Sequence, residues 1–345
     1  MKLEFVPPRY EVFRAEYPNL ALCRVTLQEK GQYCVLTEAG IQRARISGKF
    51  QYDARTVSDY PAVGDFCMAD LNRGDTAVIH IVLPRMSAFL RRAAGETATE
   101  QVIAANVDTV FLCMSLNNDF NLRRLERYLA AAWDSGATPV ILLTKKDLCD
   151  DLTSKLAQVE SVATGVEIVT VSALEQDCRR HLLPWLTKGK TLSFVGSSGV
   201  GKSTLINRLL GEDRLRTNGL RNDDKGRHTT TRRELINLPC GATVIDTPGM
   251  RELGMWDAGE GLSTAFAELE ALAARCRFQD CTHRTEPGCA VRAALERGEL
   301  SEARFHSYEK LKTENAYSED AESYLAAKEK KFKKIARINK TNQKR

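Results

Sequence analysis

No stretch of this sequence is apolar over a length that could cross a membrane. A membrane-spanning helix needs about 20 predominantly apolar residues, and every hydrophobic run here falls well short of that. The N-terminal residues MKLEFVPP also lack the apolar core of a secretory signal peptide. With 345 residues, 43% hydrophobic and 28% charged, the chain has room for two or three globular domains. We therefore expect a cytoplasmic protein with no membrane partner.

Clustered cysteines are also scarce. Seven of the ten cysteines stand singly, which is typical of proteins in a reducing cytosol. The other three occur with a histidine within fourteen residues, as Cys276-x4-Cys281-x-His283-x5-Cys289. Three thiolates and one imidazole complete a tetrahedral ligand set with no open position, which predicts one structural zinc ion. Because the spacing is not the common C-x2-C, free thiols are the alternative.

Positive charge is concentrated at the C-terminal end. Residues 328–345 carry nine Lys or Arg and one Glu, whereas the whole chain has a net charge of only +5. A basic tail on a near-neutral body favours a polyanionic partner, with nucleic acid as the first candidate. Phe332, Ile335 and Ile338 recur at helical spacing, which predicts a basic helix that folds on RNA; a solvated tail is the alternative.

Short apolar runs separated by glycine-containing turns fill residues 30–83. This spacing is typical of a small β-barrel. Aromatic and basic side chains interleave there, as on surfaces that stack bases and neutralise phosphates. The aromatic residues are Tyr33, Phe50, Tyr52 and Tyr60, and the basic ones are Arg43, Arg45, Lys49 and Arg55. Core packing is the alternative role for the aromatics. Residues 87–101 are polar with Gly and Ala, which predicts a linker or flexible loop.

A glycine-rich motif occupies the middle of the chain. Gly196-Ser197-Ser198-Gly199-Val200-Gly201-Lys202-Ser203 fits G-x-x-x-x-G-K-[ST], between an apolar run and a segment from Thr204 with helical spacing. This strand–loop–helix context predicts a triphosphate site, in which backbone N–H groups surround the phosphates. We expect Lys202 to reach the β- and γ-phosphates, Ser203 to bind Mg²⁺, and Thr204 to belong to the nucleotide-binding set.

Two strand ends that precede this loop predict guanine recognition. Thr144-Lys145-Lys146-Asp147 follows one apolar strand, and Ser172-Ala173 follows the next. The Asp147 carboxylate can accept hydrogen bonds from the two adjacent donors of guanine, which adenine lacks. We expect the Lys145 stem to lie along the base and the Ala173 N–H to reach its O6. Each signal is weak alone, and an ATPase is the alternative.

Two candidate switch segments follow the loop. The first contains Gly226-Arg227-His228-Thr229-Thr230-Thr231, in which Thr230, or else Thr229, is expected to complete the Mg²⁺ shell. The second is Asp246-Thr247-Pro248-Gly249, in which Asp246 is expected to hold Mg²⁺ and the Gly249 N–H to sense the γ-phosphate. Met250 stands where many GTPases place a water-orienting Gln and cannot fill that role. His228 is therefore the candidate catalytic residue, with Lys202 and Thr230.

Base recognition thus precedes the phosphate loop, which precedes both switches. This order resembles that of circularly permuted GTPases. With the barrel before it and the Cys/His cluster after it, nearly the whole chain is similar to the RsgA (YjeQ) family of bacterial small-ribosomal-subunit biogenesis GTPases. The resemblance implies an OB-fold, ribosome-stimulated GTP hydrolysis and a zinc-bearing domain. Thr144 departs from the Asn usual in this class, and Gly199 replaces the Asn of potassium-stimulated relatives.

We therefore expect a multidomain α/β protein. Its predicted parts are an OB-type β-barrel that binds RNA or the ribosome (1–90), a linker (91–105), a circularly permuted P-loop GTPase domain (106–256) and a mostly helical zinc-binding domain with the basic tail (257–345). The expected activity is hydrolysis of GTP to GDP and phosphate during late maturation of the small ribosomal subunit. The expected ligands are GTP or GDP, Mg²⁺ and one Zn²⁺. The expected partners of this monomer are the small subunit and its rRNA. A non-enzymatic, GTP-liganded RNA-binding factor and a GTPase of another RNA process are the alternatives.

Overall fold

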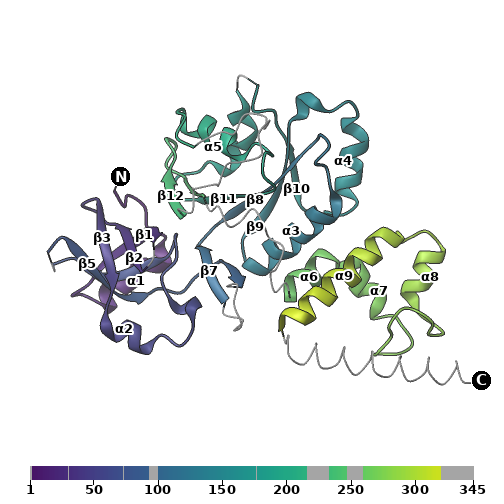
Figure 1. The fold of residues 1–345 in the computed structure, drawn as a ribbon, viewed down its shortest axis with the longest axis horizontal. Coiled ribbons are helices and arrows are strands. Elements are labelled where there is room, and N and C mark those ends of the chain that lie inside the picture. The colour runs from purple at the N-terminus through teal and green to yellow at the C-terminus, as the bar shows by residue number, and fades with distance from the viewer. Residues whose placement is uncertain are drawn as a thin grey trace, which may run out of the picture. The chain divides into compact units, whose positions relative to one another are not determined.

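The computed structural model describes residues 2–29, 31–72, 74–92, 100–175, 177–215, 233–246 and 259–319. The chain forms two compact units, Met1–Gly254 and Met255–Arg345 (Figure 1). Among the described residues, no helix has the length and apolar character needed to span a bilayer.

Five strands near the N-terminus close into a barrel. They are β1 (Ala21–Glu29), β2 (Gln32–Leu36), β3 (Ile41–Ile46), β4 (Phe66–Asp70) and β5 (Thr76–Val82). Strand β1 pairs with both β2 and β4, and β5 pairs with both β3 and β4, so this ring has no free edge. Helix α1 (Pro8–Glu16) precedes β1, and the connection from β3 to β4 carries α2 (Gly48–Asp53) and η1 (Val57–Asp59). The predicted β-barrel is confirmed.

The aromatic residues of the barrel have different environments. Tyr33, which we expected to be exposed, is only 4% exposed and packs in the barrel core with Val25, Val35 and Ile79. Tyr33 is therefore not an exposed stacking surface. Tyr52 is 90% exposed, whereas Phe50 and Tyr60 are half-buried. Because Tyr33 is interior, the mixed aromatic and basic surface is smaller than the sequence suggested.

The segment expected to be a linker contains two paired strands. β6 (Ala88–Arg92) and β7 (Glu100–Ala105) form a two-stranded antiparallel sheet. The prediction of a flexible loop is therefore wrong for these residues. The pairing shifts register between Phe89 and Leu90, which breaks the alternation that would have indicated a strand. Phe89 and Ile103 are fully buried, so apolar packing accounts for the order.

Six further strands are neighbours in the part of the sheet that lies outside the barrel, which we call the central sheet. Its strand order is β10-β9-β8-β11-β13-β12, and all neighbours are parallel except β12 and β13. The strands are β8 (Thr109–Ser115), β9 (Thr138–Thr144), β10 (Glu167–Thr170), β11 (Thr191–Val195), β12 (Arg233–Asn237) and β13 (Thr243–Asp246). The associated helices are α3 (Leu122–Ser135), η2 (Lys146–Leu148), α4 (Leu152–Glu160), η3 (Cys178–Trp185) and α5 (Lys202–Leu210). The predicted alternation of strands and helices is confirmed.

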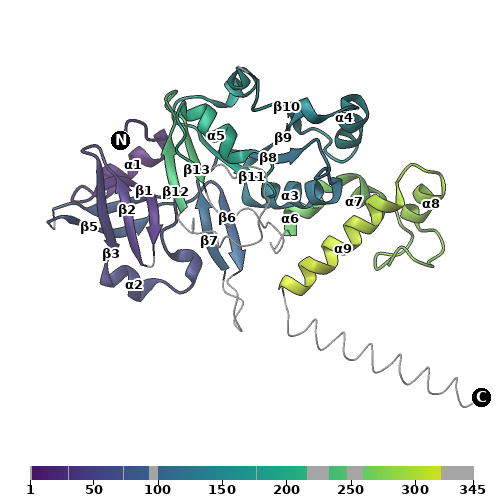
Figure 2. The same cartoon turned by 45° about the horizontal axis from the view of Figure 1, so that its top comes forward.

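The barrel and the central sheet are hydrogen-bonded to each other. β1 pairs antiparallel with β12, with Leu27 opposite Glu234 and Gln28 opposite Arg233. Figure 2 shows β12 between β13 and β1, so that one 11-stranded sheet runs through the unit. The described part of the second unit is helical, with α6 (Gly259–Ala265), α7 (Ala267–Ala273), α8 (Ala290–Glu296) and α9 (Glu302–Glu319) around a core that includes Phe266, Leu269 and Tyr308.

Candidate nucleotide site and metal cluster

The glycine-rich loop lies between β11 and α5, as its sequence predicted. β11 ends at Val195, and α5 begins at Lys202 with Gly201 as its N-cap at φ 103°. Gly196 cannot carry a side chain, because a Cβ there would lie 2.4 Å from the carbonyl oxygen of Cys113 on β8. The loop therefore lies directly against the neighbouring strand, and its N–H groups are available at the N-terminus of a helix.

The carboxyl ends of four parallel strands bring most of the predicted residues to one edge of the central sheet. Thr144 ends β9, Ser172 follows β10, Gly196 follows β11 and Asp246 ends β13. Since these strands all run parallel in one sheet, their carboxyl ends share an edge, where open α/β sheets bind ligands. Lys145, Ala173, Ser203 and Thr204 are half-buried at this edge, whereas Asp147 is exposed.

Lys202 points back over the loop. Its Nζ donates to the carbonyl oxygens of Gly196 at 2.5 Å and Ser197 at 2.7 Å. Ser198 and Gly199 at the tip are exposed, whereas Val200 is buried. The positive charge of Lys202 is thus held over the loop at the N-terminus of α5, which is an arrangement that attracts phosphate.

Thr144 connects the strand-end motif to the loop. Its buried hydroxyl donates to the carbonyl oxygen of Val200 at 2.6 Å, across 56 residues of sequence. The hydroxyl therefore makes a polar contact to the glycine-rich loop, although the usual Asn is missing. Beside it, Lys145 adopts a left-handed backbone at φ 56°, and the Lys146 N–H donates to the Val171 carbonyl.

Asp147 and Ser172 form the other half of the site. The Ser172 hydroxyl donates to Asp147 Oδ1 at 2.5 Å and also accepts from the Leu174 N–H at 3.2 Å. The serine is buried, so it fixes one carboxylate oxygen while the exposed side of Asp147 faces solvent. This geometry leaves the carboxylate available to accept from two adjacent donors of a ligand.

Sequence reasoning missed a polar group that contacts the loop. In the segment between β8 and α3, Asp119 Oδ2 accepts a short hydrogen bond from Ser197 Oγ, and Asp119 Oδ1 pairs with Arg124 at 2.8 Å. Asn121 caps α3 beside them by accepting from the Arg124 N–H. The signal was present, because Asp119 follows an apolar strand in the same way as the Thr144 motif does.

Several predicted residues lie outside the described part of the chain. They are His228, Thr229, Thr230, Gly249, Met250 and the basic tail of residues 328–345. Their assigned roles stay predictions. Asp246 is described; it is half-buried at the last position of β13.

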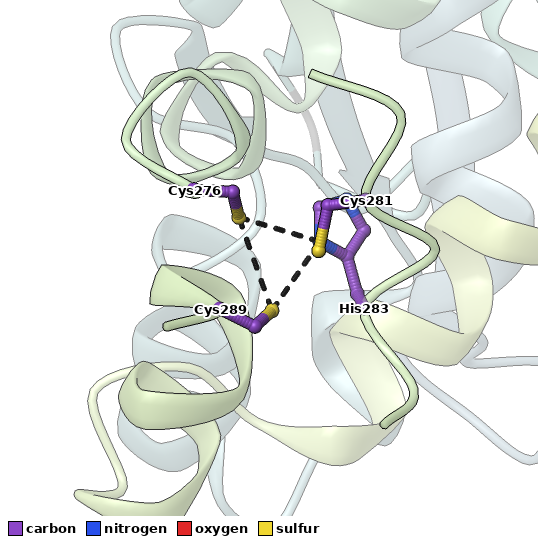
Figure 3. Close-up of side chains that lie close together, drawn as sticks. All are labelled: Cys276, Cys281, His283 and Cys289. Carbon is purple, nitrogen blue, oxygen red and sulfur yellow. Dashed lines mark hydrogen bonds between the residues drawn. The ribbon is translucent and has the colours of Figure 1, made fainter. Parts of the chain in front are cut away.

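The three cysteines and the histidine converge in the second unit (Figure 3). Their ligand atoms lie within 4.8 Å of one another. His283 Nδ1 is 3.6 Å from Cys276 Sγ and 3.5 Å from Cys289 Sγ, and these two sulfurs are 3.8 Å apart. Ligands about 2.3 Å (sulfur) and 2.0–2.1 Å (nitrogen) from one tetrahedral zinc would be about 3.6–3.8 Å apart. The cluster, completed by Cys281, therefore fits a zinc ion.

The N-terminus of α8 favours the thiolate form of Cys276, whereas desolvation raises the pKa of Cys281 to about 11. Desolvation raises the pKa of Cys276, but backbone N–H groups of Val291 and Ala290 outweigh it and leave the pKa below the ordinary value. Cys289 is the N-cap of α8, and its sulfur accepts from the Arg292 N–H at 3.4 Å. Helix N–H groups stabilise negative sulfur, which is the form that binds metal.

Comparison with known proteins gives consistent matches. The family described as RsgA GTPase matches residues 82–256. The small ribosomal subunit biogenesis GTPase RsgA 2 of Lactiplantibacillus plantarum is 53% identical over 86% of this chain and 84% of its own length. The corresponding RsgA of Opitutus terrae is 48% identical over 91% and 88%.

Two solved structures are similar over most of the chain. YjeQ from Thermotoga maritima has a TM-score of 0.64 at 27% identity, covering 86% of this chain and 99% of that one. YloQ, described as a circularly permuted GTPase, has a TM-score of 0.60 at 26% identity, covering 86% and 95%.

Proposed function

This chain belongs to the RsgA GTPase family, and from that premise we propose that it hydrolyses GTP to GDP and phosphate while bound to the small ribosomal subunit, in late maturation of that subunit. The observation that carries the proposal is the shared sheet edge, where the Lys202 loop and the Asp147–Ser172 pair lie at carboxyl ends of parallel strands. We further propose that the chain acts as a cytoplasmic monomer and that rRNA is the partner of its barrel.

The proposed ligand contacts follow from this edge. The loop residues 196–204 surround the phosphates, with Lys202 placed to neutralise charge on the β- and γ-phosphates. Asp147 accepts from the guanine edge, Ala173 donates to its O6, and the Lys145 stem covers its face. We assign the Mg²⁺ shell to Ser203, Thr230 and Asp246, and the sensing of the γ-phosphate to the Gly249 N–H.

We also propose that Cys276, Cys281, His283 and Cys289 hold one structural zinc ion. The support is the donor chemistry together with separations that match a tetrahedral site. Such an ion would bind and orient its ligands without reacting, because four protein ligands leave no open position for water or substrate.

Phosphate release with and without purified small subunits tests the proposed function. We expect multiple turnovers and a rate increase of at least about tenfold when the subunits are added. A non-enzymatic factor that merely binds GTP would release no more than one phosphate per chain under both conditions, and that result would contradict an enzymatic role.

Asp147→Asn should change the preferred base. The substitution removes an anionic acceptor for guanine N1–H and N2–H₂, so GTP affinity should fall by about 10- to 100-fold. Asparagine can donate to a carbonyl at the base C2 position, so affinity for xanthosine triphosphate should rise. Titration with GTP, xanthosine triphosphate and ATP measures this. Asp150→Asn is the control, because Asp150 is a nearby exposed carboxylate. Unchanged GTP affinity in the Asp147 variant would contradict guanine recognition by this residue.

His228→Ala should lower subunit-stimulated turnover by at least about tenfold, because Met250 has no group adequate to orient water. Single-turnover hydrolysis in the presence of small subunits measures the change. His306→Ala, at an exposed position on α9, provides the control. A stimulated rate within about threefold of the wild-type rate would show that another group orients the water.

A further inference from the structure

We propose that Arg24 is a positioning residue that locks the barrel to the two strands flanking the GTP site, so that RNA contact by the barrel orients the catalytic loops. This inference rests on the proposed function, because it assumes that the barrel contacts the small subunit and that the subunit stimulates hydrolysis. The argument depends on the bonds of Arg24, on the packing around it and on the paths of β11 and β13.

Arg24 bonds to three parts of the first unit. It lies on β1 and is only 5% exposed. Its Nε donates to the carbonyl oxygen of Gly64 in the barrel at 3.2 Å. Its Nη2 donates to Thr191 Oγ1 at 2.7 Å, and its Nη1 to Thr243 Oγ1 at 3.5 Å. Thr191 begins β11 and Thr243 begins β13, so one guanidinium connects the barrel to two neighbouring strands of the central sheet.

The contact is not explained by stability alone. Burial lowers the pKa of Arg24 to about 10, so the group stays charged at neutral pH although the charge is costly to desolvate. The carboxylates of Asp108 and Asp65 offset part of this cost, and the guanidinium lies over the Phe66 ring at 4.8 Å. An apolar side chain of similar volume often stabilises a buried site at least as much as a charged side chain does. The planar guanidinium adds directional hydrogen bonds, which fix the position of the barrel relative to β11 and β13.

The packing around Arg24 leaves little room for movement. Gly64 has φ 97°, and a Cβ there would lie 2.1 Å from the Ala105 carbonyl oxygen and 2.8 Å from Ile245 Cδ1 on β13. The same Gly64 carbonyl also accepts from Asn106 Nδ2 at 3.2 Å. The barrel backbone at Gly64 therefore lies directly against the backbone of β7 and against the Ile245 side chain of β13 in the central sheet.

The strands bonded by Arg24 carry the catalytic loops at their far ends. β11 continues into the loop that begins at Gly196, and β13 ends at Asp246. The barrel also holds a third strand of the central sheet, since β1 pairs with β12, which follows the predicted switch residues Gly226 to Thr231 in sequence. A flexible connection would only bring the GTPase domain close to the subunit. A rigid junction also fixes the orientation of the catalytic loops relative to the bound barrel.

Arg24→Met tests the inference, because methionine roughly preserves length and fills the site without donating hydrogen bonds. We expect the subunit-stimulated rate to fall by at least about tenfold, while basal hydrolysis, GDP affinity and subunit affinity stay within about threefold of wild type. Arg14→Met is the matched control, because Arg14 is a partly exposed arginine of the same region with ion pairs to Glu11 and Glu38. Thermal unfolding of both variants reports on folding.

Thr191→Val provides an independent test if Arg24→Met does not fold. It removes the hydroxyl that accepts from Nη2 at 2.7 Å and from the Thr243 hydroxyl at 3.2 Å, and we expect the same selective loss of stimulation. In the double variant the loss should not exceed that of the larger single variant, because both substitutions remove one interaction. Undiminished stimulation in Thr191→Val, or equal loss of basal and stimulated rates, would overturn the positioning role. A wild-type chain that subunits do not stimulate would instead refute the proposed function, and this inference with it.

Discussion

Lys202→Ala should reduce GTP hydrolysis by at least about a thousandfold, with or without small subunits. The Nζ atom lies 2.5 Å and 2.7 Å from two carbonyl oxygens of the phosphate loop, so its charge is held where the β- and γ-phosphates are expected. No other lysine belongs to the motif. The variant lacks the lysine that we propose as the nearest protein cation to the transferred phosphoryl group. The negative charge that develops on that group is therefore less well stabilised.

Phosphate release at saturating GTP measures the effect, together with nucleotide titration to separate binding from turnover. Lys188→Ala is the matched control, since Lys188 is an exposed lysine just before β11, at the end of that strand remote from the loop. We expect the control to retain its rate within about twofold. A loss of less than about tenfold in Lys202→Ala would mean that the loop does not hold the reacting phosphates as proposed.

Cys289→Ser should remove zinc and unfold the second unit locally. Structural zinc sites contribute roughly 10–16 kcal/mol of apparent binding free energy, and Cys276, Cys281 and Cys289 all belong to the core cluster that contains Phe266. Serine remains a good N-cap for α8. Loss of order can therefore be attributed to the metal site rather than to the helix terminus.

Two measurements on the full-length chain test this prediction. Elemental analysis should give about one zinc per wild-type chain and a small fraction of that in the variant. Hydrogen exchange should show that amides of α7 and α8 lose protection in the variant, or in wild type after chelation, while those of β11 keep it. Cys240→Ser is the control, because Cys240 is exposed and remote from the cluster in sequence. Full protection after complete metal removal would contradict a structural role.

The sequence predicted those features whose determinants are local. The phosphate loop needs glycines at fixed offsets between a strand and a helix, and the Cys/His cluster places four ligands within fourteen residues. Parallel strands then bring Thr144 and Ser172 to the same edge, by a general property of α/β sheets. These inferences required no knowledge of which distant residues touch.

Features that depend on long-range contacts could not be predicted in this way. Arg24 meets Thr191 and Thr243 across 167 and 219 residues, and nothing around a single arginine in a strand indicates such partners. Asp119 meets Ser197 across 78 residues. Tyr33 was misjudged for a related reason, because the closure of the barrel decides which face of β2 is interior.

The order of strands in the central sheet has a consequence for synthesis of the chain. The barrel strands β1 to β5 are contiguous in sequence, so this ring can close as soon as they leave the ribosome. β8, β9 and β10 emerge after β6 and β7, but one side of β8 pairs with β11, which comes after all of them. A nascent chain therefore exposes an open strand edge, with unpaired N–H and C=O groups, until the phosphate-loop strand is translated.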